Sequence, residues 1–117
     1  MDDDDIREIA LSLPATSETY PFGPEAAVFK TTANNKIFAI LSTPGGPKQT
    51  VTLKCDPEES IALREQYESI IPGYHLNKKH WITVDLDGDA PPDLVEQLVR
   101  DSHGLVKPKT PRAPRRQ

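Results

Sequence analysis

The sequence contains a single cysteine, Cys55, among its 117 residues. One cysteine excludes an internal disulfide and any zinc site built from several thiolates. Cys55 follows Lys54 at the end of a segment that we expect to be a strand. A buried thiol is usually inert, because burial disfavours the thiolate that reacts. We therefore interpret Cys55 as a half-buried structural residue and not as a nucleophile.

Long apolar runs are also missing. No stretch approaches the roughly 18 apolar residues that a helix needs to cross a bilayer. The first residues are acidic, whereas a signal peptide begins with basic residues and continues with an apolar run. We therefore expect a cytoplasmic protein that does not enter membranes. The length suits a single domain, which we place at residues 1–106, followed by a tail at residues 107–117.

The common motifs of catalysis are absent too. The sequence has no glycine-rich phosphate loop, no Gly-x-Ser-x-Gly and no His-Glu-x-x-His. His75 and His80 are five residues apart, on opposite faces of a strand; one could line a site, but we interpret both as structural. Asp85, Asp87 and Asp89 lack the spacing of a calcium loop, so a strand end and a turn explain them. We expect no enzyme activity, no cofactor and no metal.

The formal net charge of −4 conceals an uneven distribution. Five of the fourteen basic residues, and no acidic residue, lie within the last eleven positions: Lys107, Lys109, Arg112, Arg115 and Arg116. The other nine basic residues stand against eighteen acidic ones, so the body of the chain carries −9. Such a body repels nucleic acid unless its cations gather on one face. The tail is proline-rich without an apolar pattern, and we expect it to be disordered.

The spacing of apolar residues predicts three helices and four strands. They are, in order, a helix at residues 6–13, strands at 26–31, 36–41 and 49–54, a helix at 56–66, a strand at 80–86 and a helix at 92–104. Acidic residues in the first turns of the helices favour them, because they complement the helix dipole. This order predicts a two-layer α+β domain, in which an antiparallel sheet has helices packed on one face.

Prolines and glycines mark the connections between these elements. We expect an ordered loop at residues 14–25, whose Tyr20 and Phe22 close one edge of the core. We expect a turn at residues 69–73. Gly104 is predicted to end the last helix in a left-handed conformation.

Residues 80–86 alternate between apolar side chains and other kinds. If the apolar residues face the helices, Trp81 and Thr83 lie on the open side of the sheet, together with Lys79. An ammonium, an indole and a hydroxyl on an open sheet can bind phosphate and stack on a base, and they can equally keep a sheet soluble. An exposed tryptophan usually has a partner. This segment is therefore the first candidate for a binding surface.

Four strings of residues resemble the bacterial MmcQ/YjbR family. They are Tyr20-Pro21-Phe22-Gly23, Lys54-Cys55-Asp56-Pro57-Glu58, Pro72-Gly73-Tyr74-His75-Leu76-Asn77-Lys78-Lys79-His80-Trp81 and Ser102-His103-Gly104-Leu105-Val106. The resemblance spans residues 4–106 and leaves out the tail. It implies a fold similar to the CyaY/frataxin type, a curved antiparallel sheet backed by helices. It also implies DNA binding, because that sheet is similar to the "double wing" surface of some transcription factors.

DNA binding through the open face of the sheet is therefore our first hypothesis. The matching motif supplies the candidate contacts Asn77, Lys78, Lys79, His80 and Trp81. Strand alternation adds Lys30, Thr52, Lys54 and Thr83. We expect a monomer that binds DNA weakly, through phosphates and with little base readout. The tail would add nonspecific attraction, or it is a solvated terminus without a partner.

The alternative hypothesis is a frataxin-like module that binds metal or a protein. The aspartates at residues 2–5 offer oxygen ligands to a hard cation, and Trp81 could anchor a protein partner. The same aspartates suit a helix start, where acidic side chains cap the backbone and complement the dipole.

Overall fold

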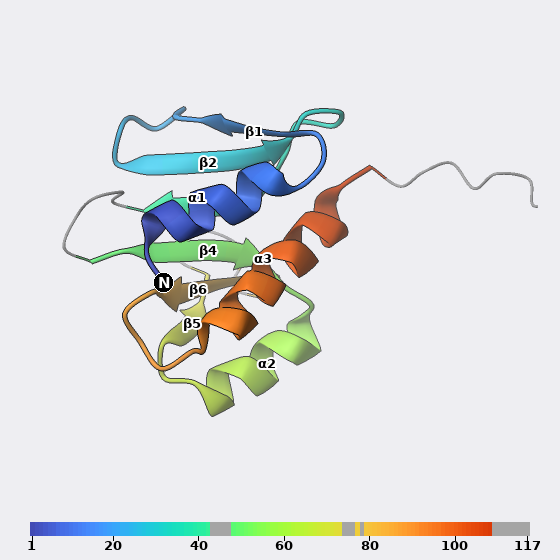
Figure 1. The fold of residues 1–117 in the computed structure, drawn as a ribbon. Coiled ribbons are helices and arrows are strands. Elements are labelled where there is room, and N and C mark those ends of the chain that lie inside the picture. Colours follow the sequence, from blue (N-terminus) through green and yellow to red (C-terminus); the bar gives the residue numbers. More distant parts are fainter. Residues whose placement is uncertain (43–47, 74–76, 78, 109–117) are drawn as a thin grey trace, which may run out of the picture.

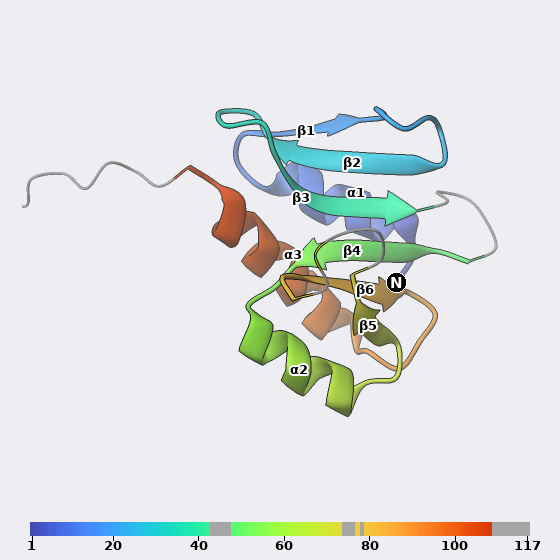
Figure 2. The same cartoon turned by 180° about the vertical axis from the view of Figure 1, so that it is seen from behind.

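The structure is a computed structural model that describes residues 1–42, 48–73, 77 and 79–108. The described chain folds into a six-stranded sheet and three helices (Figures 1 and 2). In order, the elements are α1 (Asp3–Ser12), β1 (Thr16–Thr19), β2 (Ala26–Thr31), β3 (Lys36–Ser42), β4 (Thr50–Lys54), α2 (Pro57–Gln66), β5 (Ile70–Pro72), β6 (Trp81–Asp85) and α3 (Pro92–Val106). Among these residues, no helix has the length and apolarity needed to cross a bilayer.

All neighbouring strands of the sheet are antiparallel, in the order β1-β2-β3-β4-β6-β5. Helices α1 and α3 cover one face, and α2 lies beside β5 at that edge (Figures 1 and 2). The other face we call the open face. One row of opposed residues crosses it from edge to edge: Thr19, Val28, Ile40, Thr52, Thr83 and Ile71. The expected two-layer α+β architecture is confirmed.

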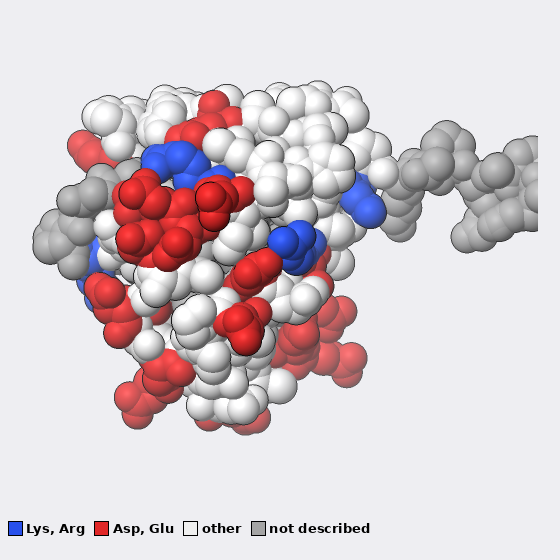
Figure 3. Space-filling model, viewed as in Figure 1, with Lys and Arg blue, Asp and Glu red and all other residues white. Residues whose placement is uncertain are grey.

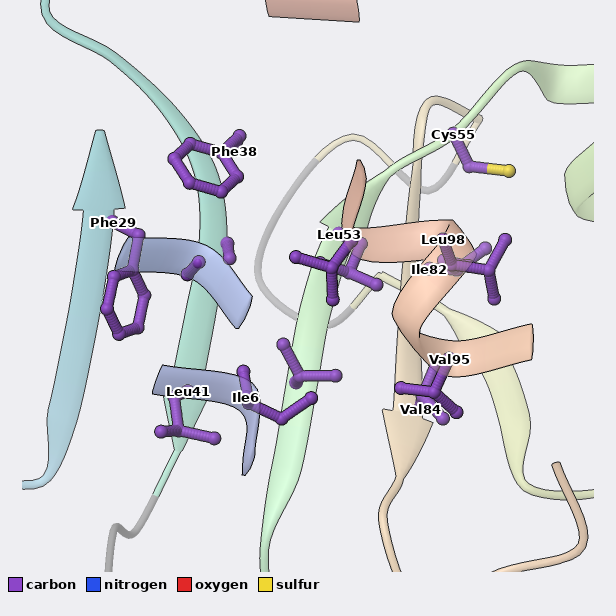
Figure 4. Packing of buried hydrophobic residues seen from close by; sticks show 14 of the residues in the cluster. Ile6, Phe29, Phe38, Leu41, Leu53, Cys55, Ile82, Val84, Val95 and Leu98 are labelled. Carbon is purple, nitrogen blue, oxygen red and sulfur yellow. The ribbon is translucent and has the colours of Figure 1, made fainter. Parts of the chain in front are cut away.

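The hydrophobic core lies between the sheet and helices α1 and α3 (Figure 4). Ile6 of α1 and Phe29, Phe38 and Leu53 of the sheet are completely buried. Burial of side chains of this size stabilises the fold by roughly 1.5–3 kcal/mol each. His103 of α3 is also buried, with its ring edge-on to Phe38 at 5.2 Å between centroids. The core therefore fixes both helices against the middle strands.

A β-bulge in β3 aligns the sheet with α3. Phe29 is opposite Ala39, but the next residue, Lys30, is opposite Ile37, so Phe38 is the extra residue. A bulge lets consecutive residues face the same side, and both Phe38 and Ala39 are buried in the core. Ser102 of α3 donates its hydroxyl to the Phe38 carbonyl at 2.6 Å and accepts the Lys54 amide at 2.9 Å. These bonds join α3 to both β3 and β4.

Two strands were not expected from the sequence. β1 lies in the segment predicted as an ordered loop, and β5 lies in the segment predicted as a turn. The prediction that Tyr20 and Phe22 close the core was wrong, because these side chains are 45% and 69% exposed. The pairing of β1 with β2 holds this segment at the edge of the sheet, which leaves its aromatic rings outside.

The predicted left-handed cap at Gly104 was also wrong. Helix α3 continues through Gly104 to Val106, and its last backbone bond runs from the Lys107 amide to the His103 carbonyl. The helix gains by continuing, because His103 and Val106 are buried against the rest of the protein. Packing therefore outweighs the cost of about 1 kcal/mol for a glycine inside a helix.

Candidate functional site

Strands β4 and β6 carry four of the predicted contact residues. The two strands pair antiparallel, with Lys54 opposite Trp81 and Thr52 opposite Thr83. Residues directly opposite each other in an antiparallel pair lie on the same face. The fold thus brings an ammonium, an indole and two hydroxyls together on the open face, with Lys54 and Trp81 at one end of their strands.

Thr52 and Thr83 lie on the open face and yet are buried, at 5% and 7% exposure. Their hydroxyl oxygens are 2.9 Å apart and share a hydrogen bond. A hydroxyl engaged in this way is less available to a ligand than an exposed one. The two threonines therefore form a polar floor of the open face, whereas the sequence predicted outward contacts.

Trp81 is half-buried, not fully exposed as the sequence suggested. The amide of Gly73 donates to the Trp81 carbonyl at 2.7 Å. A Cβ atom on Gly73 would lie 2.4 Å from the Trp81 Cβ, so only glycine allows this approach. Since α1 and α3 lie on the opposite face (Figure 2), neither of these helices covers the indole. Gly73 therefore fixes the backbone and Cβ of Trp81 from one side.

The lysines of the strands share one end of the sheet. Lys30 lies near the end of β2, Lys36 begins β3 and Lys54 ends β4, and antiparallel pairing places these positions side by side. Trp81 begins β6 at the same end. Lys30, Lys54 and Trp81 lie on the open face at this end, and we call these three residues the lysine end, whereas Lys36 is opposite Thr31 and lies on the helix side.

The lysine end also receives the end of α3. Asn34, in the turn between β2 and β3, donates its side-chain amide to the Val106 carbonyl at 2.8 Å. Lys107 follows directly and is exposed. The basic segment that begins at Lys107 therefore leaves the domain beside the lysine end.

The remaining candidates belong to the segment before β6. Asn77, Lys79 and His80 are exposed, and β6 begins at Trp81, one residue later than expected. Asn77 accepts the Lys79 amide on its side chain at 2.9 Å and the His80 amide on its carbonyl at 3.1 Å. The His80 carbonyl accepts the Cys55 amide at 2.8 Å, which ties this turn to the end of β4. The candidate Lys78 lies outside the described residues, as does His75.

The opposite end of the sheet is acidic. Asp85 ends β6 opposite Thr50, and its carboxylate accepts the Asp87 amide at 3.0 Å, which confirms the predicted strand end and turn. A shallow cleft of about 160 Å³ lies there, lined by Lys48, Glu68 and Asp85 among others. We call Glu68, Asp85, Asp87 and Asp89 the acidic end. The open face is thus polarised along its strands.

Acidic residues also begin α2, directly after Lys54 and Cys55. Asp56 caps the helix by accepting the amides of Glu58 and Glu59 at 3.0 and 3.4 Å. Burial, with the nearby Glu59 carboxylate as a smaller cause, raises the pKa of Cys55 to about 12. The Cys55 thiol therefore stays protonated at neutral pH, which fits a structural residue.

The acidic start of the chain forms a helix cap. Asp2 accepts the amide of Asp5, and Asp5 accepts the amide of Asp2, both at 3.0 Å. The backbone bond from Asp5 is the main reason that the pKa of Asp2 is lowered. Carboxylate oxygens of Asp2, Asp3 and Asp4 lie within 4.8 Å of one another and could hold a metal ion. Capping accounts for the same aspartates without one.

Comparisons with known proteins agree on one family. A model of the YjbR family matches residues 11–105. The Escherichia coli O157:H7 protein YbdF is 42% identical over 100 residues, which cover 86% of this chain and 80% of YbdF. The Bacillus subtilis protein YyaQ is 35% identical over 103 residues, which cover 79% of this chain and 86% of YyaQ.

Solved structures give the same result. The crystal structure of the Deinococcus radiodurans protein DR2400 matches with a TM-score of 0.83 and 42% identity, over 90% of this chain and 78% of that one. A crystal structure of a Pseudomonas syringae protein matches with a TM-score of 0.80 and 30% identity, over 92% of this chain and all of that one.

Proposed function

Since the chain belongs to the YjbR family, we propose that it binds DNA through the open face of its sheet, weakly and mainly by phosphate contacts. Lys30 and Lys54 on the strands and Lys79 in the turn before β6 neutralise phosphates, and Trp81 stacks on a base. The similarity of this kind of sheet to double-wing DNA-binding surfaces supports the proposal at the level of fold only.

The distribution of acidic residues is the observation that carries the proposal. The six strands contain three lysines and only two of the eighteen acidic residues, Glu18 and Asp85. Glu18 lies on the helix side, where Arg7 of α1 donates to it at 3.0 Å. Most other acidic residues lie on the helices and their caps, and Figure 3 shows many of them on the side that α1 and α3 cover. On the open face itself the strands carry two lysines, Lys30 and Lys54, and one acidic residue, Asp85, which lies at the opposite end.

The small number of lysines sets the expected strength of binding. The three lysines alone contribute about −2.7 to the slope of the logarithm of the binding constant against the logarithm of salt, which lowers affinity about 40-fold between 50 and 200 mM. A protein with these contacts binds detectably at low salt and loses DNA near physiological ionic strength. Sequence preference is expected to be small, since phosphate contacts carry no base information.

The test is a salt titration of labelled DNA, duplex and single-stranded, followed by fluorescence anisotropy. Lys54→Gln and Lys79→Gln each remove one cation from the proposed surface and should reduce the salt slope by about 1. Arg100→Gln changes the net charge equally but acts on α3, where Arg100 pairs with Glu96 at 2.8 Å. This control should bind DNA almost as the wild type does. Failure to bind either form of DNA at 50 mM salt, or equal losses in all three variants, would contradict the proposal.

The frataxin-like alternative has no specific observation in its favour. The acidic residues at the start of α1 act as a capping box, and Trp81 lies on the sheet away from them. We therefore propose DNA binding in preference to the frataxin-like function.

A further inference from the structure

The width of the sheet helps to determine whether the open face binds duplex or single-stranded DNA. This inference rests on the proposed function, DNA binding. Neighbouring strands are about 4.8 Å apart, so six strands span about 24 Å. The major groove of a duplex is about 12 Å wide and admits a helix or a two-stranded ribbon. Within the described chain, α1 and α3 lie behind the sheet and α2 lies at its β5 edge (Figure 2). The whole width of the sheet is thus too broad to enter a duplex groove.

Stacking on a sheet requires an unpaired base and a firmly held aromatic ring. Gly73 fixes the point from which the indole of Trp81 extends, because it packs against the Trp81 Cβ and donates to the Trp81 carbonyl at 2.7 Å. Next to it on the same face, the hydroxyls of Thr52 and Thr83 bond to each other and make a buried polar floor. Bases inside a duplex are stacked on their neighbours, whereas those of a single strand can turn onto an aromatic side chain.

Charge determines where along the strands the backbone of such a ligand would lie. Lys30 and Lys54 stand two strands apart at the lysine end, about 10 Å from each other by strand spacing. Trp81 lies directly opposite Lys54. At the acidic end, Asp85 lies on the same face and Glu68 lines the adjoining cleft. Phosphates are therefore attracted to the end that holds the indole and repelled from the other.

The start of α2 limits this surface on one side. Asp56, Glu58 and Glu59 follow Lys54 in the chain and are exposed. The carboxylate of Asp56 is occupied by the helix amides that it caps. A phosphate backbone would approach Lys54 from the side of β2 and β3, where Lys30 lies on the open face, and away from these acids.

From these observations we infer that single-stranded DNA is the preferred ligand, lying across the strands at the lysine end with one base stacked on Trp81. Phosphates on either side of that base meet Lys54 and Lys30. The site is small, so it takes a short stretch of DNA with little preference for sequence.

The protein offers its own probe, because Trp81 is its one tryptophan. We would titrate the full chain at 50 mM salt with a single-stranded oligonucleotide of mixed sequence and with the duplex formed by that oligonucleotide and its complement. The expected result is binding of the single strand at least tenfold tighter than the duplex, with quenching of the indole fluorescence. The RNA strand of the same sequence is a third ligand, and tighter binding of RNA would overturn the choice of DNA.

Two pairs of variants locate the site, with binding followed by anisotropy of labelled DNA. Lys54→Gln should weaken single-strand binding several-fold, whereas Lys48→Gln, which removes a lysine from the acidic end, should change it less than twofold. Trp81→Leu should weaken binding about tenfold, and Trp81→Phe, which keeps a ring and the fold, should weaken it less. Circular dichroism checks that each variant is folded.

The outcomes separate this inference from the proposed function. Duplex binding that equals or exceeds single-strand binding, or binding without quenching, overturns the inference and leaves DNA binding in place. Equal effects of Lys48→Gln and Lys54→Gln overturn the location at the lysine end. Absence of binding to every form of DNA overturns the proposed function itself.

Discussion

At the scale of single residues, the contact between Gly73 and Trp81 decides whether the indole holds its place. A Cβ at Gly73 would meet the Trp81 Cβ at 2.4 Å and the Trp81 backbone at 2.9 Å, and neither group can move without shifting β6. We expect Gly73→Ala to destabilise the protein by about 1–3 kcal/mol, as overpacking does elsewhere. Urea unfolding measures the loss, and a shifted emission maximum of Trp81 reports the displacement.

Gly104→Ala is the matched control for this substitution. A Cβ at Gly104 would meet nothing within 4 Å, and the residue is helical within α3. Alanine is favoured over glycine in such a place by about 0.5–1 kcal/mol, so this variant should be more stable than the wild type. Equal effects of the two substitutions would show that the close approach at Gly73 is not the cause.

Cys55 makes a pH-dependent contribution to stability. The pKa of its thiol is raised from 9.0 to about 12 in the folded protein, chiefly by burial. Above pH 9 the unfolded chain loses this proton while the folded protein keeps it, so stability falls between pH 9 and 12 and is unaffected below. We expect wild type to lose about 1 kcal/mol more than Cys55→Ala does between pH 8 and pH 10.

Urea unfolding of both proteins at the two pH values tests this prediction. The other ionisable groups are common to the two proteins, so their contributions cancel in the difference. A thiol that reacts equally fast in the folded and unfolded wild type at pH 8 would contradict the burial on which the prediction rests.

At the scale of elements, Asp89 fastens the connection between β6 and α3 to the start of β5. Its carboxylate accepts the amides of Glu68 and Ser69 at 3.1 and 3.0 Å, and the Ser69 hydroxyl accepts the Ala90 amide at 3.2 Å. The bonds from Ser69 are the main cause of the lowered pKa of Asp89. The contribution to stability is therefore present above the ordinary pKa of 3.8 and is lost as the pH falls through the lower, folded value.

We expect Asp89→Ala to loosen β5 locally. The measurement is hydrogen exchange of the Glu68 and Ser69 amides, which should become faster at neutral pH, because their acceptor is gone. Asp87→Ala is the control, since Asp87 is a neighbouring exposed acid and only its backbone amide takes part in the turn. Unchanged exchange in Asp89→Ala, or an equal acceleration in Asp87→Ala, would contradict the proposed role of this carboxylate.

The elements that the sequence predicted are those with a strong local pattern. The spacing of apolar side chains and the positions of prolines predicted the bounds of β2, β3, β4, β6 and the three helices to within a few residues. β1 has no such pattern, because all four of its side chains are partly exposed at the edge of the sheet. β5 has three residues and includes Pro72. Both strands exist because a neighbouring strand pairs with them, and a single sequence carries little sign of such pairing.

In the candidate site, too, the sequence predicted the features that follow from a local pattern and missed those that depend on strand pairing. Alternation was enough to place Trp81, Thr83, Thr52 and Lys54 on one face. It could not place Lys54 opposite Trp81, since that needs the register of two strands that are not consecutive in the chain. It also could not show that Thr52 and Thr83 are buried, because their burial depends on the rest of the fold.

At the scale of the whole molecule, charge is separated in two directions. Acidic residues predominate on the side that α1 and α3 cover (Figure 3), and the open face divides into a lysine end and an acidic end. Interactions between exposed charges extend over about 10 Å at 0.1 M salt. The acidic residues therefore weaken binding on the open face more at low salt than at high salt, which partly offsets the attraction by the lysines.

The basic segment of the chain starts at Lys107, next to the lysine end. Its positive charges can outweigh the repulsion that the acidic residues exert on DNA. Removal of residues 109–117 deletes four cations and no acid, and it changes the formal net charge from −4 to −8. We expect the free energy of unfolding to stay the same. DNA affinity at 50 mM salt should fall, and the slope against salt should decrease by up to about 3, because each lost phosphate contact removes 0.7–0.9.

A second variant, with glutamine in place of Lys109, Arg112, Arg115 and Arg116, keeps the length and should behave as the truncation does. If the glutamine variant binds as the wild type does, the chain itself and not its charge is responsible; if both variants keep the full slope, the phosphate contacts lie on the sheet alone.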